Sequence, residues 1–115
     1  MMLMISSQGD TLQSQPSMRF GRTPIFIKYD LDNNNWEAIE NTAIFSSGGA
    51  GVAASQSLID HGITHALSGR FGPNAWRALK AAGIHMLTFD ENCSTVAEVI
   101  QRFKENQLTE VTDPE

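Results

Sequence analysis

The sequence predicts an α/β protein, because residues 68–85 have the pattern of a strand end, a loop, a helix and a second strand. Pro73 suits the first helical turn, where its missing N–H costs nothing, and apolar residues then recur at helical spacing up to residue 82. Gly83 supplies a left-handed residue that ends the helix, and an extended run starts at Ile84. These elements form a βαβ unit, so the two strands are expected to be parallel.

The first part of the chain predicts a central strand and a hairpin. Residues 2–6 are apolar on both faces, as a strand between two helix layers requires. Residues 25–29 and 36–40 flank a turn-forming segment, 30–35, and are expected to pair with each other. Because residues 36–40 alternate between apolar and polar, we expect this strand to lie at the edge of the sheet.

Two further helices are predicted, one before and one after the βαβ unit in the sequence. One covers residues 50–61, buries Val52, Leu58 and Ile59, and is stopped by Gly62. The other starts at Thr95 with the spacing of a capping box, continues as an apolar stripe and ends near residue 105. With strands at 63–67 and 84–89, the predicted order is β-β-β-α-β-α-β-α. This describes a five-stranded mixed sheet with helices on both faces.

The length of 115 residues favours one domain, which we place at residues 1–108, followed by an acidic flexible tail at 109–115. The net charge of −5 disfavours a protein that binds nucleic acid through its phosphates. A single cysteine precludes an intrachain disulfide and favours the cytoplasm. The apolar start, residues 1–5, is too short for a signal sequence or a membrane span.

Several short motifs resemble one known family. They are Arg19-Phe20-Gly21-Arg22-Thr23-Pro24, Gly48-Gly49-Ala50-Gly51, Gly72-Pro73-Asn74-Ala75, Ala81-Ala82-Gly83-Ile84-His85 and the helix start Thr95-Val96. Their order and spacing resemble the dinitrogenase iron–molybdenum cofactor biosynthesis family over roughly residues 2–107. The resemblance implies a three-layer, ribonuclease H-like fold. The family includes carriers related to nitrogen fixation, which hold the iron–molybdenum cofactor or its iron–sulfur precursor transiently during metallocofactor assembly. It also includes many small stand-alone proteins, often from organisms that do not fix nitrogen, and this chain resembles a small stand-alone member.

Three loops that contain these motifs, residues 19–22, 47–51 and 70–74, form a candidate anion site. Two of them precede helices at the carboxyl ends of strands, where open α/β sheets bind ligands and where helix N-termini attract anions. Arg19, Arg22 and Arg70 add full positive charges. The predicted binding residues are Arg19, Gly21, Arg22, Ser47, Gly48, Gly49, Gly51, Arg70, Gly72 and Asn74. The alternative is that the glycines only permit tight turns and that the arginines are solvated.

Two residues are candidate metal ligands. The resemblance points to His85, because carriers of this family commonly have a histidine at this position; they usually follow it with proline, whereas Met86 follows here. Cys93 precedes a helix N-terminus, which would favour a thiolate able to bind iron. The alternatives are a hydrogen-bonded strand histidine and an ordinary loop cysteine. One cysteine with scattered histidines cannot close a four-ligand cluster site within one chain.

These features together predict a non-enzymatic carrier or accessory protein that binds an anionic iron–sulfur or iron–molybdenum cluster. The expected partners are the cluster and cluster-assembly proteins, with no nucleic acid or membrane, and the chain is expected to be a monomer or weak dimer. A nuclease is disfavoured because residues 2–6 contain no carboxylate for two-metal chemistry. The alternative function is a regulatory or interaction module that binds another small anion, or a protein at the edge strand near Trp36, without metal.

Overall fold

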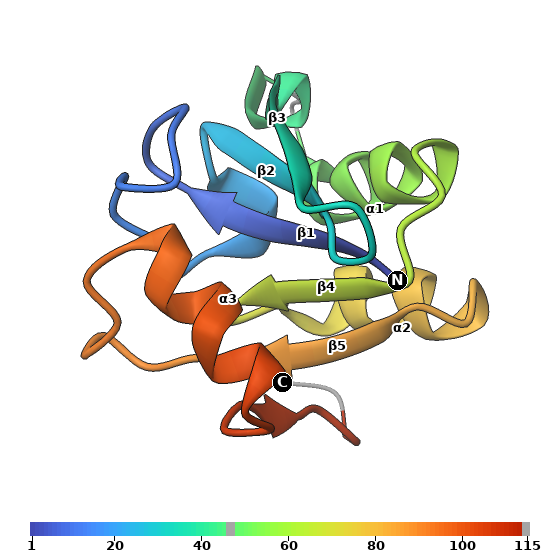
Figure 1. Ribbon diagram of the computed structural model, residues 1–115. Coiled ribbons are helices and arrows are strands. Elements are labelled where there is room, and N and C mark those ends of the chain that lie inside the picture. The colour runs from blue at the N-terminus through green and yellow to red at the C-terminus, as the bar shows by residue number, and fades with distance from the viewer. Residues whose placement is uncertain (46–47, 114–115) are drawn as a thin grey trace.

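The computed structural model describes residues 1–45 and 48–113, which form a mixed α/β fold around a single sheet (Figure 1). The strands are β1 (Met2–Ser7), β2 (Ile25–Asp30), β3 (Asn35–Glu40), β4 (His65–Ser68), β5 (His85–Thr88) and β6 (Thr109–Glu110). They lie in the order β3-β2-β1-β4-β5-β6. Strands β1, β4 and β5 are parallel, whereas the β2–β3 hairpin is antiparallel and extends the sheet beyond β1. The predicted α/β class and the position of the hairpin are confirmed.

The sheet has six strands, so the prediction of five was wrong. The additional strand, β6, pairs antiparallel with β5 through Thr109 and Glu110, two residues of the segment predicted as a tail. The N–H of Val111 also donates to the carbonyl of Met86 at 2.8 Å. Two residues are too few to show an alternating hydrophobic pattern, which is why the sequence did not reveal this strand.

In the part of the chain that the structure describes, three helices cover the two faces of the sheet. Helices α1 (Ala50–Asp60) and α2 (Pro73–Ala81) pack on one face, and α3 (Val96–Lys104) packs on the other (Figure 1). Two short 3-10 turns, η1 (Phe20–Arg22) and η2 (Thr42–Phe45), lie beside α1. Within the described residues, no helix has the length and apolar character needed to cross a bilayer.

Helix α1 buries a different face from the one predicted. Leu58 is fully buried, but Val52 is 50% exposed and Ile59 is 41% exposed, so the predicted burial of these two residues was wrong. The buried face instead follows Ala50, Ala54 and Leu58, which recur at the four-residue spacing of one helix face. With alanines on this face, α1 packs closely against α2, η1 and η2, while the larger Val52 and Ile59 are exposed.

Candidate anion-binding site

A cavity of about 710 Å³ opens at the carboxyl end of β4. Its lining comes from three segments that are distant in sequence: residues 18–22, 49–51 and 69–75. The second segment forms the start of α1, and the third connects β4 to the start of α2. The structure therefore brings together the three loops that the sequence singled out.

Close backbone contacts hold the three segments together. The N–H of Phe20 donates to the carbonyl of Arg70 at 3.0 Å. A Cβ atom on Gly21 would lie 3.2 Å from the Cα of Gly51, and one on Gly51 would lie 3.3 Å from the Cβ of Ala75. Gly21 and Gly51 therefore serve packing, because they let η1, α1 and α2 approach one another closely.

Two helix N-termini face the cavity without a side-chain cap. Gly49 is the N-cap of α1 and Gly72 is the N-cap of α2, and neither helix has an acidic residue in its first turn. The first N–H groups of a helix have no acceptor within the helix, and the helix dipole places partial positive charge there. A Cβ on Gly49 or on Gly72 would meet nothing within 4 Å, so the space beside both N-caps is open.

The N-terminus of α3, in contrast, has side-chain acceptors for its backbone N–H groups. The Thr95 side chain accepts from the N–H of Glu98 at 3.1 Å, and the Glu98 carboxylate accepts from the N–H of Ser94 at 3.3 Å. Thr95 thus caps the helix as the sequence predicts, while Glu98 reaches back to Ser94, one residue before the N-cap, and adds a negative charge in the first turn. In α1 and α2 the N-cap residue is glycine, which supplies no such acceptor.

Arginine side chains add positive charge at the same place. Arg19, Arg22 and Arg70 line the cavity and are exposed, and the described lining residues include no carboxylate. Across residues 1–45 and 48–113 none of the three forms an ion pair; Arg22 donates to the carbonyl of Ile44 at 3.2 Å. Guanidinium groups that are not neutralised by the protein remain available for bidentate contacts with an anion.

Most of the predicted binding residues lie in the cavity wall. They are Arg19, Gly21, Arg22, Gly49, Gly51, Arg70, Gly72 and Asn74. Gly48 is exposed but does not belong to the lining, and Ser47 lies outside the described residues. The two candidate metal ligands are elsewhere.

His85 is the first residue of β5, at the end of the parallel strands opposite the cavity. Its Nδ1 lies 3.2 Å from a carboxylate oxygen of Glu110 on β6, and its ring stacks on that of His65 with centroids 4.8 Å apart. Partial burial, followed by the nearby His85, lowers the pKa of His65 below its usual value. His85 therefore belongs to a surface cluster that is separate from the cavity.

Cys93 is 4% exposed and lies in the core beneath α3, on the face of the sheet opposite α1 and α2. Burial raises the pKa of its thiol, which disfavours the thiolate form that metal binding requires. In the part of the chain that the structure describes, no three His, Cys, Asp or Glu side chains are grouped so that they could hold a metal ion.

The cavity also contains residues that the sequence interpretation did not select. Met18 and Phe71 line it, next to Arg19 and Arg70 in the sequence. Met18 crosses Gly69 so closely that a Cβ on this glycine would lie 2.5 Å from the Met18 methyl group. The only sequence signal that could have placed Met18 and Phe71 in the cavity was their position next to Arg19 and Arg70. The sequence does not show which way the side chain of an apolar loop residue points.

Comparisons with known proteins give a consistent result. The family model described as dinitrogenase iron-molybdenum cofactor matches residues 1–106. The apo form of the orange protein from Desulfovibrio gigas is 32% identical with a TM-score of 0.93, and the match covers 99% of this chain and 95% of that one. A Thermotoga structure described as NifB-like, of the DUF35 family, is 38% identical with a TM-score of 0.86, covering 99% of this chain and 96% of that one. No curated protein matches significantly.

Proposed function

Because the chain belongs to the dinitrogenase iron–molybdenum cofactor family, we propose that it is a carrier that holds an anionic metallocluster in the cavity between α1 and α2. Family membership and the two related structures support a small accessory protein in metallocluster handling. The finer proposal is that an iron–sulfur or iron–molybdenum cluster binds without enzymatic turnover and is passed on during cofactor assembly.

The observation that supports this proposal most directly is the pair of uncapped helix N-termini in one cavity. Free N–H groups and helix dipoles favour a compact anion, and Arg19, Arg22 and Arg70 add full charges on the rim. A cluster with surface sulfides and an organic acid is an anion of this kind. Met18, which is 38% exposed, supplies an apolar contact against which sulfide-rich surface can pack.

The binding mode follows from the same residues. Neither His85 nor Cys93 reaches the cavity, so the proposal assigns no metal–ligand bond to either side chain. The cluster would be held by hydrogen bonds and charge, with its own ligands retained. Such binding is reversible, which suits a protein that receives a cluster and releases it.

The proposal can be tested by anaerobic equilibrium dialysis against isolated iron–molybdenum cofactor, with molybdenum measured in the protein chamber. Arg70→Ala is expected to weaken binding about tenfold or more, because a hydrogen bond to a charged group contributes roughly 1.5–3 kcal/mol. Lys80→Ala is the matched control, since it removes the same charge from the last turn of α2, away from the lining. Absence of protein-bound molybdenum in the wild type, or equal affinities for the two variants, would refute the proposal.

A further inference from the structure

The outer edge of β3 is the longest open backbone edge of the sheet. Strand β3 ends the strand order, whereas the opposite end is the two-residue β6. Five of its six residues are exposed, among them Trp36, which is 41% exposed. An open strand edge presents unpaired N–H and C=O groups that can pair with another chain.

The pairing pattern identifies which backbone groups point outward. The N–H of Asn41 donates to the carbonyl of Pro24 at 3.0 Å, which extends the β2–β3 register by one hydrogen-bonded pair. Hydrogen-bonded and non-hydrogen-bonded pairs alternate in an antiparallel ladder, so residues 35, 37 and 39 bond to β2. The N–H and C=O groups of Trp36, Ala38 and Glu40 therefore point away from the sheet.

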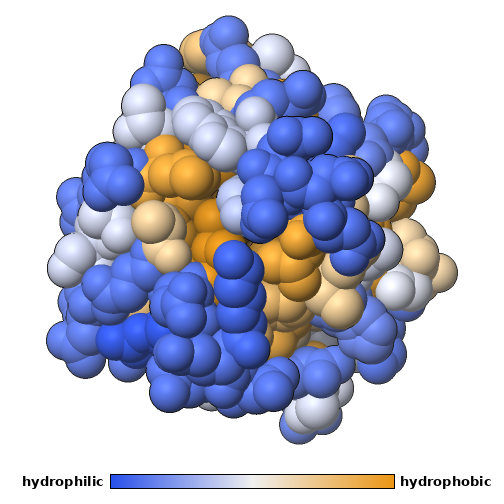
Figure 2. Space-filling model, viewed as in Figure 1, coloured by the Kyte–Doolittle hydropathy of each residue, from blue (hydrophilic) through white to orange (hydrophobic). Residues whose placement is uncertain are grey.

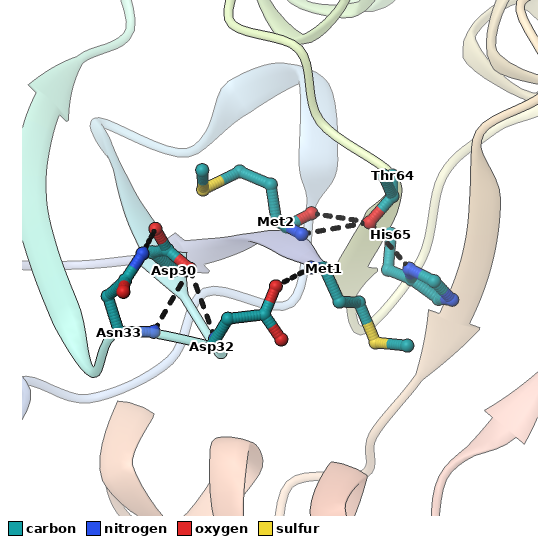
Figure 3. A network of polar contacts seen from close by, with 7 residues as sticks. All are labelled: Met1, Met2, Asp30, Asp32, Asn33, Thr64 and His65. Atoms are coloured by element: carbon teal, nitrogen blue, oxygen red, sulfur yellow. Dashed lines mark hydrogen bonds and ion pairs between the residues drawn. The ribbon is translucent and has the colours of Figure 1, made fainter.

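The surroundings of this edge are acidic. The hairpin, residues 25–40, contains four carboxylates, Asp30, Asp32, Glu37 and Glu40, against one basic residue, Lys28, which lies across from Glu37 on β2. Asp30 remains ionised because a hydrogen bond from the Asn33 side chain, above all, lowers its pKa (Figure 3). Asp32 pairs with the N-terminal ammonium at 2.7 Å, but among the described residues Glu37 and Glu40 have no ion-pair partner.

One face of the hairpin is also uncovered. By alternation, Trp36, Ala38 and Glu40 share the α3 side of the sheet, yet no residue of β3 belongs to the core beneath α3. Figure 2 shows apolar surface between α3 and the hairpin on this side. A strand added to β3 would therefore find backbone partners, an apolar strip on one face and carboxylates along its length.

We propose that the outer edge of β3 accepts an extended segment of a partner protein, with basic side chains among apolar ones, as an additional strand. Charge complementarity selects this occupant, because a basic segment neutralises Glu37 and Glu40. A second copy of the chain is a poor occupant, since it would bring two acidic hairpins together. No residue of β3 lines the cavity, so a partner could bind at this edge while the cavity is filled.

The test uses a ten-residue peptide of alternating lysine and valine, blocked at both ends, and NMR-detected amide exchange. The peptide is expected to slow exchange at Trp36, Ala38 and Glu40, whereas a glutamate–valine peptide is not. Ala38→Pro removes an outward N–H and keeps the ladder to β2, so the protein still folds but binds about tenfold more weakly. Circular dichroism checks that this variant is folded.

Charge variants provide a test that does not depend on proline. Glu37→Gln with Glu40→Gln is expected to weaken binding of the lysine–valine peptide about fivefold, because each of the two exposed ion pairs contributes a factor of about two. Glu91→Gln with Glu105→Gln changes the net charge equally, away from the edge, and should bind as the wild type does. The proposal would be overturned if the lysine–valine peptide did not bind, or if folded Ala38→Pro bound it as tightly as the wild type does. It would also be overturned if the peptide slowed amide exchange at residues outside β3, or if the chain associated with itself through β3.

Discussion

Replacing Asn74 by aspartate is expected to stabilise the ligand-free protein while weakening its anion binding. Asn74 lies in the first turn of α2, which contains no acidic residue, and its side-chain oxygen accepts a hydrogen bond from Arg77. An acidic residue near a helix N-terminus contributes about 0.3–1 kcal/mol, and an ion pair three residues apart adds about 0.2–0.5 kcal/mol. The free energy of unfolding should therefore rise by about 0.5–1.5 kcal/mol, which corresponds to a higher Tm by about 2–8 °C.

The same charge acts against a ligand in the cavity, because Asn74 is part of the wall. At a separation of about 5 Å in water-like surroundings, two like charges repel by about 0.8 kcal/mol. The Kd should therefore rise about fourfold for each unit of negative charge on the ligand. Since asparagine and aspartate have nearly the same shape, a change in cavity volume does not contribute.

Thermal unfolding followed by circular dichroism measures the first effect, and anaerobic titration with iron–molybdenum cofactor measures the second. Gln107→Glu, beyond the end of α3, gives the same change in net charge and should leave binding unchanged. If Asn74→Asp is destabilising, the N-terminus of α2 is not an unsatisfied positive site. If it binds the cofactor as tightly as the wild type does, the cavity is not where the anion sits.

Three further predictions concern stability. Gly72→Ala should lower the free energy of unfolding by about 1–3 kcal/mol in a urea titration, because φ of 79° and ψ of 162° lie in a region nearly restricted to glycine; no change would mean that the loop relaxes freely. Leu58→Ala should cost about 2–5 kcal/mol and Val52→Ala less than about 0.5 kcal/mol in the same assay; similar costs would contradict the burial of α1. Because the folded protein lowers the pKa of His65 from 6.5, the unfolded chain binds the proton more readily, so the free energy of unfolding should fall as the pH drops below about 6.5. The His65→Gln variant should show a shallower decline, and an identical pH profile for the two proteins would assign the effect to other groups.

The order of elements could be predicted because each main segment has a strong local signal. The apolar run of β1, the alternation of β3 and the capping box of α3 require no knowledge of neighbours. Predicting the buried face of α1, in contrast, does require knowledge of the neighbouring elements. A helix rich in alanine and serine has a weak hydrophobic stripe, and only the close contact of Gly51 with Ala75 reveals how α1 is turned.

The candidate site shows the same division between local and spatial information. The loops that precede α1 and α2 could be grouped in advance, because the carboxyl ends of parallel strands meet at one edge. His85 and Cys93 could not be placed in this way. His85 begins a strand rather than ending one, and the core beneath α3 extends far enough to bury Cys93 in what the sequence presents as an exposed connection.

The contrast between the three helix N-termini connects the sequence to the proposed function. Glycine at an N-cap costs only a few tenths of a kcal/mol relative to serine or threonine, but it leaves the first N–H groups without a side-chain acceptor. Helices α1 and α2 both start this way and both open into one cavity, whereas Thr95 and Glu98 close the start of α3. An anion that binds the folded chain alone would add stability that grows with the logarithm of its concentration once this exceeds the Kd. Glycine N-caps on α1 and α2 therefore cost the protein little stability, and they keep a set of N–H donors available for reversible binding of a ligand.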